Sequence, residues 1–135
     1  MPPRHSWWRN GGLTAGGSAG KHVLIVEDSE VVTDALRVLF EESGYEVSLA
    51  HTLAEARTVA AQARIDVAIV DLRLPDGDGA TLAHEWRRSG PPAVALSGEA
   101  GSETKQRAIA AGFRDSFVKP VPIAELLRRV AELMK

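Results

Sequence analysis

Acidic residues follow two apolar runs of this chain, at the points where each run would end as a strand. Glu27 and Asp28 come directly after the run at 23–26, and Asp71 follows the run at 67–70. If the two runs are neighbouring parallel strands, their carboxyl ends meet at one edge of the sheet and the three carboxylates share a pocket. Such a cluster repels itself unless a divalent cation lies among the oxygens, and Mg²⁺ accepts few carboxylates while keeping water and phosphate oxygens. The pattern therefore indicates a magnesium site suited to phosphoryl chemistry.

Two further polar residues end apolar runs later in the chain. Ser97 follows the run at 93–96, and Lys119 follows Phe117-Val118. A carboxylate that receives a phosphoryl group needs in-line access, a metal to neutralise the phosphoryl oxygens, and donors for the remaining charge. Asp71, Mg²⁺, Ser97 and Lys119 would supply these. Each residue alone is a weak signal, because acids and serines after strands are often only caps or turn residues. The inference rests on their combination.

Short apolar runs alternate with amphipathic patterns from residue 21 onward, and this alternation would position the polar residues. The runs predict strands at 22–26, 45–50, 67–70, 93–96 and 116–118. The predicted helices begin with a stripe at 31–40, continue with one that opens on the capping box of Thr52 and Glu55, and end with 79–88, 102–111 and 122–134. This order predicts an α/β fold, a doubly wound parallel sheet of five strands in the order 2-1-3-4-5. The first and third strands are then neighbours.

Composition and charge narrow the class of protein. The chain has 135 residues and a net charge of -2, which gives no general attraction to nucleic acid or to acidic membranes. The absence of cysteine excludes disulfides, redox thiols and thiolate zinc sites. No apolar run approaches the roughly 20 residues that span a bilayer, and the start lacks the apolar core of a signal peptide. We expect a cytoplasmic protein.

Residues 1–20 differ from the rest, because they are rich in glycine and have no sustained periodicity. They predict a flexible leader before one folded domain at 21–135, with Trp7-Trp8 as the one feature that a partner could bind.

Two stretches resemble known ligand-binding motifs but lack residues that those motifs require. The stretch 16–21 lacks the first glycine and the final hydroxyl of a phosphate loop, and 74–85 has Leu74 where a calcium loop needs a carboxylate. The second stretch is better interpreted as a turn that leads into a helix.

From about residue 21 to the end, the sequence resembles the receiver domain of two-component response regulators, a flavodoxin-like (CheY-like) fold. The resemblance rests on VLIVEDS, VDLRLPDGDG, ALSG and FVKP, which occur in the expected order and spacing. It implies that Asp71 accepts a phosphoryl group from a sensor histidine kinase, and that the domain catalyses only its own phosphorylation and dephosphorylation. It also implies a cis peptide bond before Pro120. Phosphoryl oxygens would be bound by Ser97 and Lys119; the implied metal ligands are Asp28, Asp71 and the backbone carbonyl of Arg73, with Glu27 acting mainly through a metal-bound water.

The resemblance also implies protein partners. Besides the kinase, a histidine phosphotransfer protein and a second copy of the chain are candidates, with the fourth helix, fifth strand and fifth helix as the docking surface. Because the sequence stops at Lys135, we expect no output domain. A phosphorylation-independent interaction module and a phosphate shuttle remain as alternatives. A dehalogenase-type phosphatase fits poorly because Arg73 stands where it needs an acid, and a flavodoxin because Glu27-Asp28 replace its phosphate loop.

Two positions set this chain apart from the usual pattern. Many receivers have Tyr or Phe three residues before the lysine as a conformational switch, but here that residue is Ser116. Phe117 comes one place later, so strand alternation points it to the opposite side. Beside the acceptor, Arg73 and Glu99 border the predicted pocket. We expect either an ion pair across its mouth that restricts attacking water, or two solvated side chains.

Overall fold

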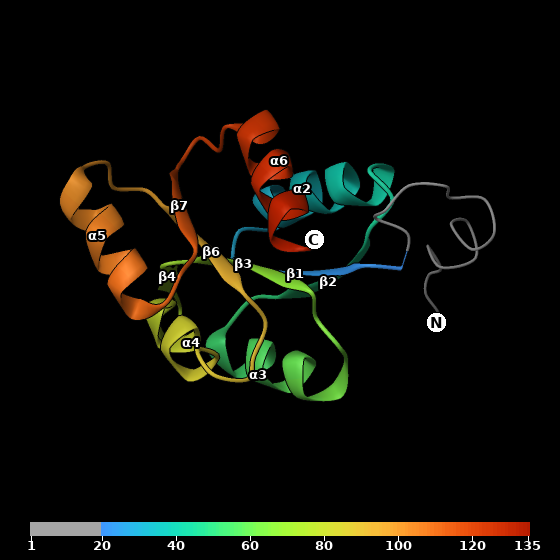
Figure 1. Cartoon of the computed structure of the whole chain (residues 1–135), viewed down its shortest axis with the longest axis horizontal. Helices are drawn as coiled ribbons and strands as arrows, with labels where there is room; N and C mark the ends of the chain where they lie inside the picture. Colours follow the sequence, from blue (N-terminus) through green and yellow to red (C-terminus); the bar gives the residue numbers. More distant parts are fainter. Residues whose placement is uncertain (1–19) are drawn as a thin grey trace.

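The computed structural model describes residues 20–135, and its centre is a parallel sheet of five strands in the order β2-β1-β3-β6-β7. The predicted doubly wound fold is therefore confirmed, and β1 and β3 are neighbours (Figure 1). The predicted leader, including Trp7-Trp8, lies outside the described residues apart from Gly20. The strands of the sheet are β1 (His22–Val26), β2 (Glu46–Ala50), β3 (Val67–Asp71), β6 (Ala93–Ser97) and β7 (Asp115–Val118). The helices are α2 (Glu30–Glu42), α3 (Leu53–Gln62), α4 (Ala80–Glu85), α5 (Ser102–Ala111) and α6 (Ile123–Leu133).

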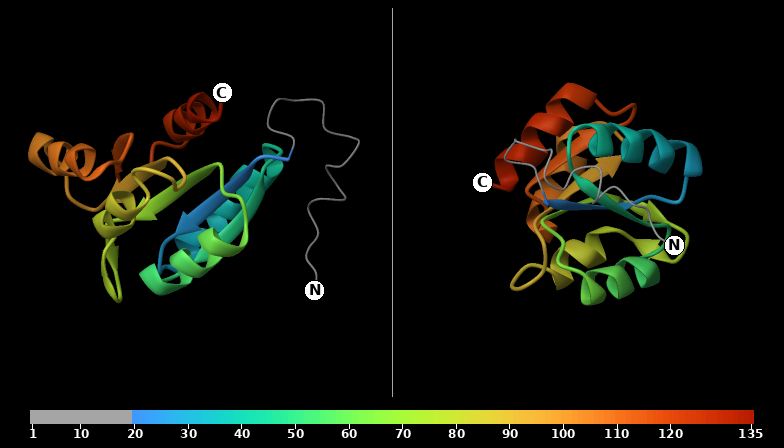
Figure 2. Two further views of the ribbon diagram at one scale, coloured as in Figure 1. Left: turned by 60° about the horizontal axis from the view of Figure 1, so that its bottom comes forward. Right: turned by 90° about the vertical axis from the view of Figure 1, so that its right-hand side faces the viewer.

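Helices cover both faces of the sheet, with α2 and α6 on one face and α3 and α4 on the other (Figures 1 and 2). Successive side chains of a strand point to opposite faces, so each strand contributes to two cores. In β3, Val67 and Ile69 pack with α2 and α6, whereas Ala68 and Val70 pack on the other side with α3, α4 and α5. Every residue of β3 and β6 is buried. Burial on both faces explains why these strands are continuous apolar runs rather than alternating ones.

Side-chain caps fix where the first two helices begin. The Ser29 hydroxyl accepts from the Val32 amide at 3.4 Å, and the Thr52 hydroxyl accepts from the Glu55 amide at 3.0 Å. The predicted capping box is therefore present in its first half. Its second half differs, because the Glu55 carboxylate accepts from the amide of His51, one residue before the cap, at 2.7 Å.

Helix α4 is shorter than predicted, and it ends at Glu85 instead of at residue 88. Trp86 is its C-cap, and the Gly90 amide donates to the Trp86 carbonyl at 3.0 Å. A Cβ at Gly90 would clash with the Trp86 side chain, so the glycine lets the chain turn back against the indole. A small antiparallel hairpin of β4 (Arg73–Leu74) and β5 (Gly77–Asp78), which the sequence analysis had only as a turn, precedes this helix.

Gly79, the residue before α4, lies directly against the end of β3. Its φ of -59° is open to any residue, but a Cβ there would clash with the Asp71 carbonyl oxygen and lie 2.9 Å from a Val70 methyl group. Gly79→Ala should therefore lower the free energy of unfolding by about 1–3 kcal/mol, measured by urea denaturation. Gly98→Ala is the matched control, because a Cβ there meets no atom within 4 Å. An equal loss in both variants would contradict the steric explanation.

Candidate functional site

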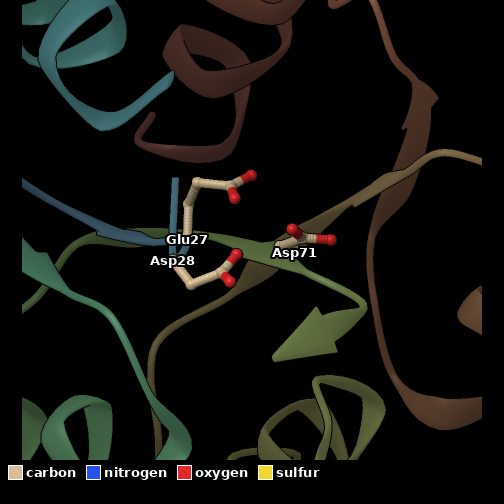
Figure 3. Close-up of side chains that lie close together, drawn as sticks. All are labelled: Glu27, Asp28 and Asp71. Carbon is tan, nitrogen blue, oxygen red and sulfur yellow. The ribbon is translucent and has the colours of Figure 1, made fainter. Parts of the chain in front are cut away.

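The three carboxylates predicted to meet at the carboxyl edge of the sheet do so. One oxygen from each of Glu27, Asp28 and Asp71 lies within 4.8 Å of the others (Figure 3). Val26 is in register with Val70, so the residues after these two positions leave neighbouring strands at the same level. Glu27 is 1% exposed and Asp71 is 5% exposed, whereas Asp28 is exposed to solvent. Two buried acids beside a solvent-facing one form an oxygen donor set that fits Mg²⁺, which keeps several of its waters.

Lys119 joins the two buried acids. Its Nζ lies 2.7 Å from Glu27 Oε1 and 2.9 Å from Asp71 Oδ2. Burial by itself would lower the pKa of Lys119, but hydrogen bonds to both carboxylates outweigh burial and raise the pKa. For Glu27, burial raises the pKa more than the hydrogen bond from Lys119 lowers it. The Lys119 ammonium therefore stays charged. One ammonium among three neighbouring carboxylates leaves the site with too little positive charge to balance them.

Backbone amides fix the orientation of both buried carboxylates. The second oxygen of Glu27 accepts from the Ser29 amide at 3.0 Å, and Asp71 Oδ1 accepts from the Arg73 amide at 3.1 Å. Ser29 also caps α2, so the start of that helix and the Glu27 carboxylate are set by the same turn. The acceptor candidate thus sits in a fixed geometry before any ligand arrives.

Ser97 reaches the same edge, but its hydroxyl is turned toward the following loop. The side chain is 4% exposed, accepts from the Glu99 amide at 2.9 Å and donates to the Glu99 carbonyl at 3.1 Å. In the structure, the Ser97 hydroxyl therefore forms hydrogen bonds with the loop backbone and not with Asp71. Sequence reasoning placed the residue in the pocket and could not foresee this orientation, because a serine hydroxyl has several rotamers of similar energy.

Asp71 opens onto a cavity of about 410 Å³, so the acceptor candidate is accessible although it is almost buried. Ser97, Lys119 and Arg73 line the same cavity. At its mouth, Arg73 Nη2 lies 3.1 Å from Glu99 Oε2, so the two side chains form the ion pair that was one of the two alternatives. The two side chains are 86% and 55% exposed, so the pair contributes little to stability.

The departure at residue 116 leaves the α5 side of β7 without an aromatic residue. Ser116 is in register with Ala95, which faces the core beneath α5. Phe117 is packed in the opposite core with Leu126 and Val130 of α6, as strand alternation predicts. The peptide bond between Lys119 and Pro120 is cis, as the resemblance implied.

Asp76, in the turn of the β4–β5 hairpin, is a structural residue that sequence reasoning missed. Its carboxylate accepts from the amides of Leu53 at 2.8 Å and Ala54 at 3.1 Å, so it caps α3 from 22 or more residues away in the chain. These amide hydrogen bonds lower the pKa of Asp76. Local patterns gave no signal, because Thr52 already looked like a complete cap. Only the position of the hairpin beside α3 in the folded protein reveals this cap.

The fold and this edge together define a flavodoxin-like α/β protein with a cluster of acidic side chains where two neighbouring parallel strands end. Residues 23–131 match the sequence profile described as the response regulator receiver domain. The chain therefore belongs to the response regulator receiver domain family. Within residues 20–135 no helix combines the length and apolar character needed to cross a bilayer.

Relatives and solved structures agree with this assignment. The chain is 36% identical over 115 residues to the virulence transcriptional regulatory protein PhoP of Salmonella typhimurium, covering 84% of this chain and 51% of that protein. The chain thus spans about half the length of the curated relatives it matches. It is similar to a receiver domain of the Francisella response regulator 1452, with a TM-score of 0.80 and 28% identity over 85% of this chain and 97% of that one. It also resembles the beryllofluoride-activated NtrC4 receiver domain dimer, with a TM-score of 0.78 and 27% identity over 84% and 95%.

Proposed function

We propose that this chain is a phosphoacceptor in which Asp71 receives a phosphoryl group from a phosphohistidine of a sensor histidine kinase. The observation that supports this most directly is the position of Asp71. Its carboxylate is held by Lys119 and by the Arg73 amide, lies beside Glu27 and Asp28, and opens onto a cavity. An aspartate that only stabilised the fold would need neither access to solvent nor two neighbouring acids. The two acids make its ionised form less favourable by charge repulsion.

In the proposed transfer, a carboxylate oxygen of Asp71 forms a bond to phosphorus while the phosphorus–nitrogen bond of the phosphohistidine breaks, and the imidazole leaves with the bonding pair. Mg²⁺, held by Asp28, Asp71, the Arg73 carbonyl and, through water, Glu27, would neutralise charge on the phosphoryl oxygens. Lys119 would move its hydrogen bond from Asp71 to a phosphoryl oxygen. Ser97 would have to release the Glu99 backbone before its hydroxyl could donate to the phosphoryl group.

The remaining expectations follow from this function. The protein would act in the cytoplasm, without catalysis beyond its own phosphorylation and dephosphorylation. A histidine phosphotransfer protein and a second copy of the chain are proposed partners, and the NtrC4 receiver domain is an example of a dimer among similar structures. With Ser116 and Phe117 as found, output would not use an inward-swinging aromatic at residue 116. The alternative of a phosphorylation-independent module predicts no labelling at all.

The deciding experiment is incubation of the chain with acetyl phosphate or a phosphorylated kinase, with Mg²⁺ and with excess chelator. We expect one acid-stable, base-labile phosphoryl group per chain, formed only with Mg²⁺, and peptide mapping to Asp71. Absence of labelling by both donors would favour the phosphorylation-independent alternative.

The Arg73–Glu99 pair should slow hydrolysis of the acyl phosphate by covering the mouth of the cavity. Loss of an exposed ion pair changes free energy by at most about 1 kcal/mol, so Arg73→Ala and Glu99→Ala should each speed dephosphorylation about two- to fivefold. The measurement is the decay of labelled protein after donor removal. A control is Arg128→Ala, which removes an exposed ion pair on α6 whose residues do not line the cavity. Unchanged decay in both mouth variants would reject the gate.

A further inference from the structure

Unpaired arginines gather around a second cavity, at the opposite end of the sheet from Asp71. Six arginines of residues 20–135 form ion pairs with carboxylates. The others in this range, which have no carboxylate partner, are Arg87, Arg88, Arg107 and Arg114. Three of these four, all except Arg107, line one cavity of about 200 Å³. No Asp or Glu of the described chain lines it.

The cavity lies between the end of α4, the end of α5 and the start of β6. Ala93, the first residue of β6, lines it, whereas Ser97 at the other end of that strand lines the Asp71 cavity. The two cavities are therefore separated by the length of a five-residue strand, roughly 13 Å. An anion bound here would not be a ligand of the phosphorylation site.

A backbone carbonyl holds one arginine of this cavity in place. Arg87 Nη2 donates to the Ala110 carbonyl at 2.7 Å, which leaves its other donors available. Gly112 has φ +122°, and a Cβ there would lie 3.6 Å from Arg87 Nε and 3.0 Å from the Ala83 carbonyl oxygen. Any larger residue would thus be strained and would press against the Ala83 carbonyl. Trp86 and the prolines at 91 and 92 form the remaining wall.

We propose that this cavity binds a phosphate-type dianion, either free phosphate or the terminal phosphate of a nucleotide. Guanidinium groups match phosphate oxygens in shape and bind them with charge-assisted hydrogen bonds. Three cationic side chains that line one cavity without a carboxylate among them repel each other, and a dianion would relieve that repulsion. The volume fits a phosphate or diphosphate group but is below the range of sites that enclose a whole cofactor. The rest of a larger ligand would therefore lie outside.

The test is titration of the full chain, without Mg²⁺ and at constant ionic strength, with inorganic phosphate, diphosphate, ADP and adenosine. We expect saturable shifts of the amide resonances of Gly112 and Arg114 with every phosphate-bearing compound and none with adenosine. Phosphate binding as strong as ADP binding would identify free phosphate as the ligand, and much tighter ADP binding would identify a nucleotide. Arg88→Gln and Arg114→Gln should each weaken binding about tenfold or more, the equivalent of one charge-assisted hydrogen bond.

Arg107→Gln is the matched control, because Arg107 is the unpaired arginine that lines the Asp71 cavity instead. It removes the same charge and should leave these shifts unchanged, as should Asp71→Asn. The proposal is overturned if no phosphate compound gives saturable shifts, or if Arg107→Gln weakens binding as much as Arg114→Gln. It is also overturned if only a glutamate-rich peptide produces the shifts, because the surface would then be one for acidic protein segments.

Discussion

Asp71→Asn is expected to abolish Mg²⁺-dependent labelling completely, with both acetyl phosphate and a phosphorylated kinase as donors. The amide cannot act as the attacking oxyanion, and it also removes one charge from the proposed Mg²⁺ site. Its oxygen can still accept from the Arg73 amide or from Lys119, so the fold should be kept. Labelling is measured by intact-protein mass and by radioactive phosphate, and folding by urea denaturation.

Asp78→Asn is the matched control for this experiment. Asp78 lines the same cavity, is exposed, and accepts from the Ala80 amide at 2.9 Å, a bond that an asparagine can also accept. This variant should be labelled like the wild type. Kinase-dependent labelling that persisted in Asp71→Asn would remove Asp71 from its proposed role.

Lys119→Met is expected to lower the free energy of unfolding at pH 7 by about 3 kcal/mol or more, because it leaves Glu27 and Asp71 buried and unpaired. The pKa of Glu27 is already raised by burial, and loss of the lysine removes the largest influence that lowers it. A carboxyl whose pKa is higher in the folded state binds protons more tightly when folded. The deficit should therefore shrink as pH falls from 7 toward 5, and Mg²⁺ should reduce it at pH 7.

The measurement is urea denaturation of the variant and the wild type at several pH values, with and without Mg²⁺. Lys105→Met serves as control, since Lys105 is 58% exposed and pairs with Asp115 at 3.3 Å. That variant should lose at most about 1 kcal/mol, without dependence on Mg²⁺. A deficit in Lys119→Met that is the same at every pH and unaffected by Mg²⁺ would mean that lost packing, not unpaired charge, destabilises the protein.

The order of the strands, and with it the meeting of Glu27, Asp28 and Asp71, could be predicted because few topologies satisfy alternating strands and helices. Each of these acids directly follows an apolar run, so a small error in strand length does not move it to another edge. Lys119 was placed for the same reason. These predictions used short continuous apolar runs for strands, such as 67–70, and period-3.6 patterns for helices.

What sequence reasoning missed depends on contacts between distant segments or on rotamers. The early end of α4 follows from the packing of Gly90 on Trp86, which no helical pattern contains. The direction of the Ser97 hydroxyl depends on the backbone of Glu99 in a loop. The cap that Asp76 provides for α3 requires knowledge that the hairpin lies beside that helix.

The attachment of Asp76 to α3 limits how this region can vary. Surface loops usually tolerate inserted or deleted residues. Here the segment is tied at one end by the Gly79 amide to the Leu72 carbonyl, at 2.9 Å, and in its middle to the first turn of α3. One residue more or fewer between positions 72 and 76 would either uncap that helix or shift the loop that follows Asp71. We therefore expect this segment to tolerate changes of exposed side chains better than changes in its number of residues.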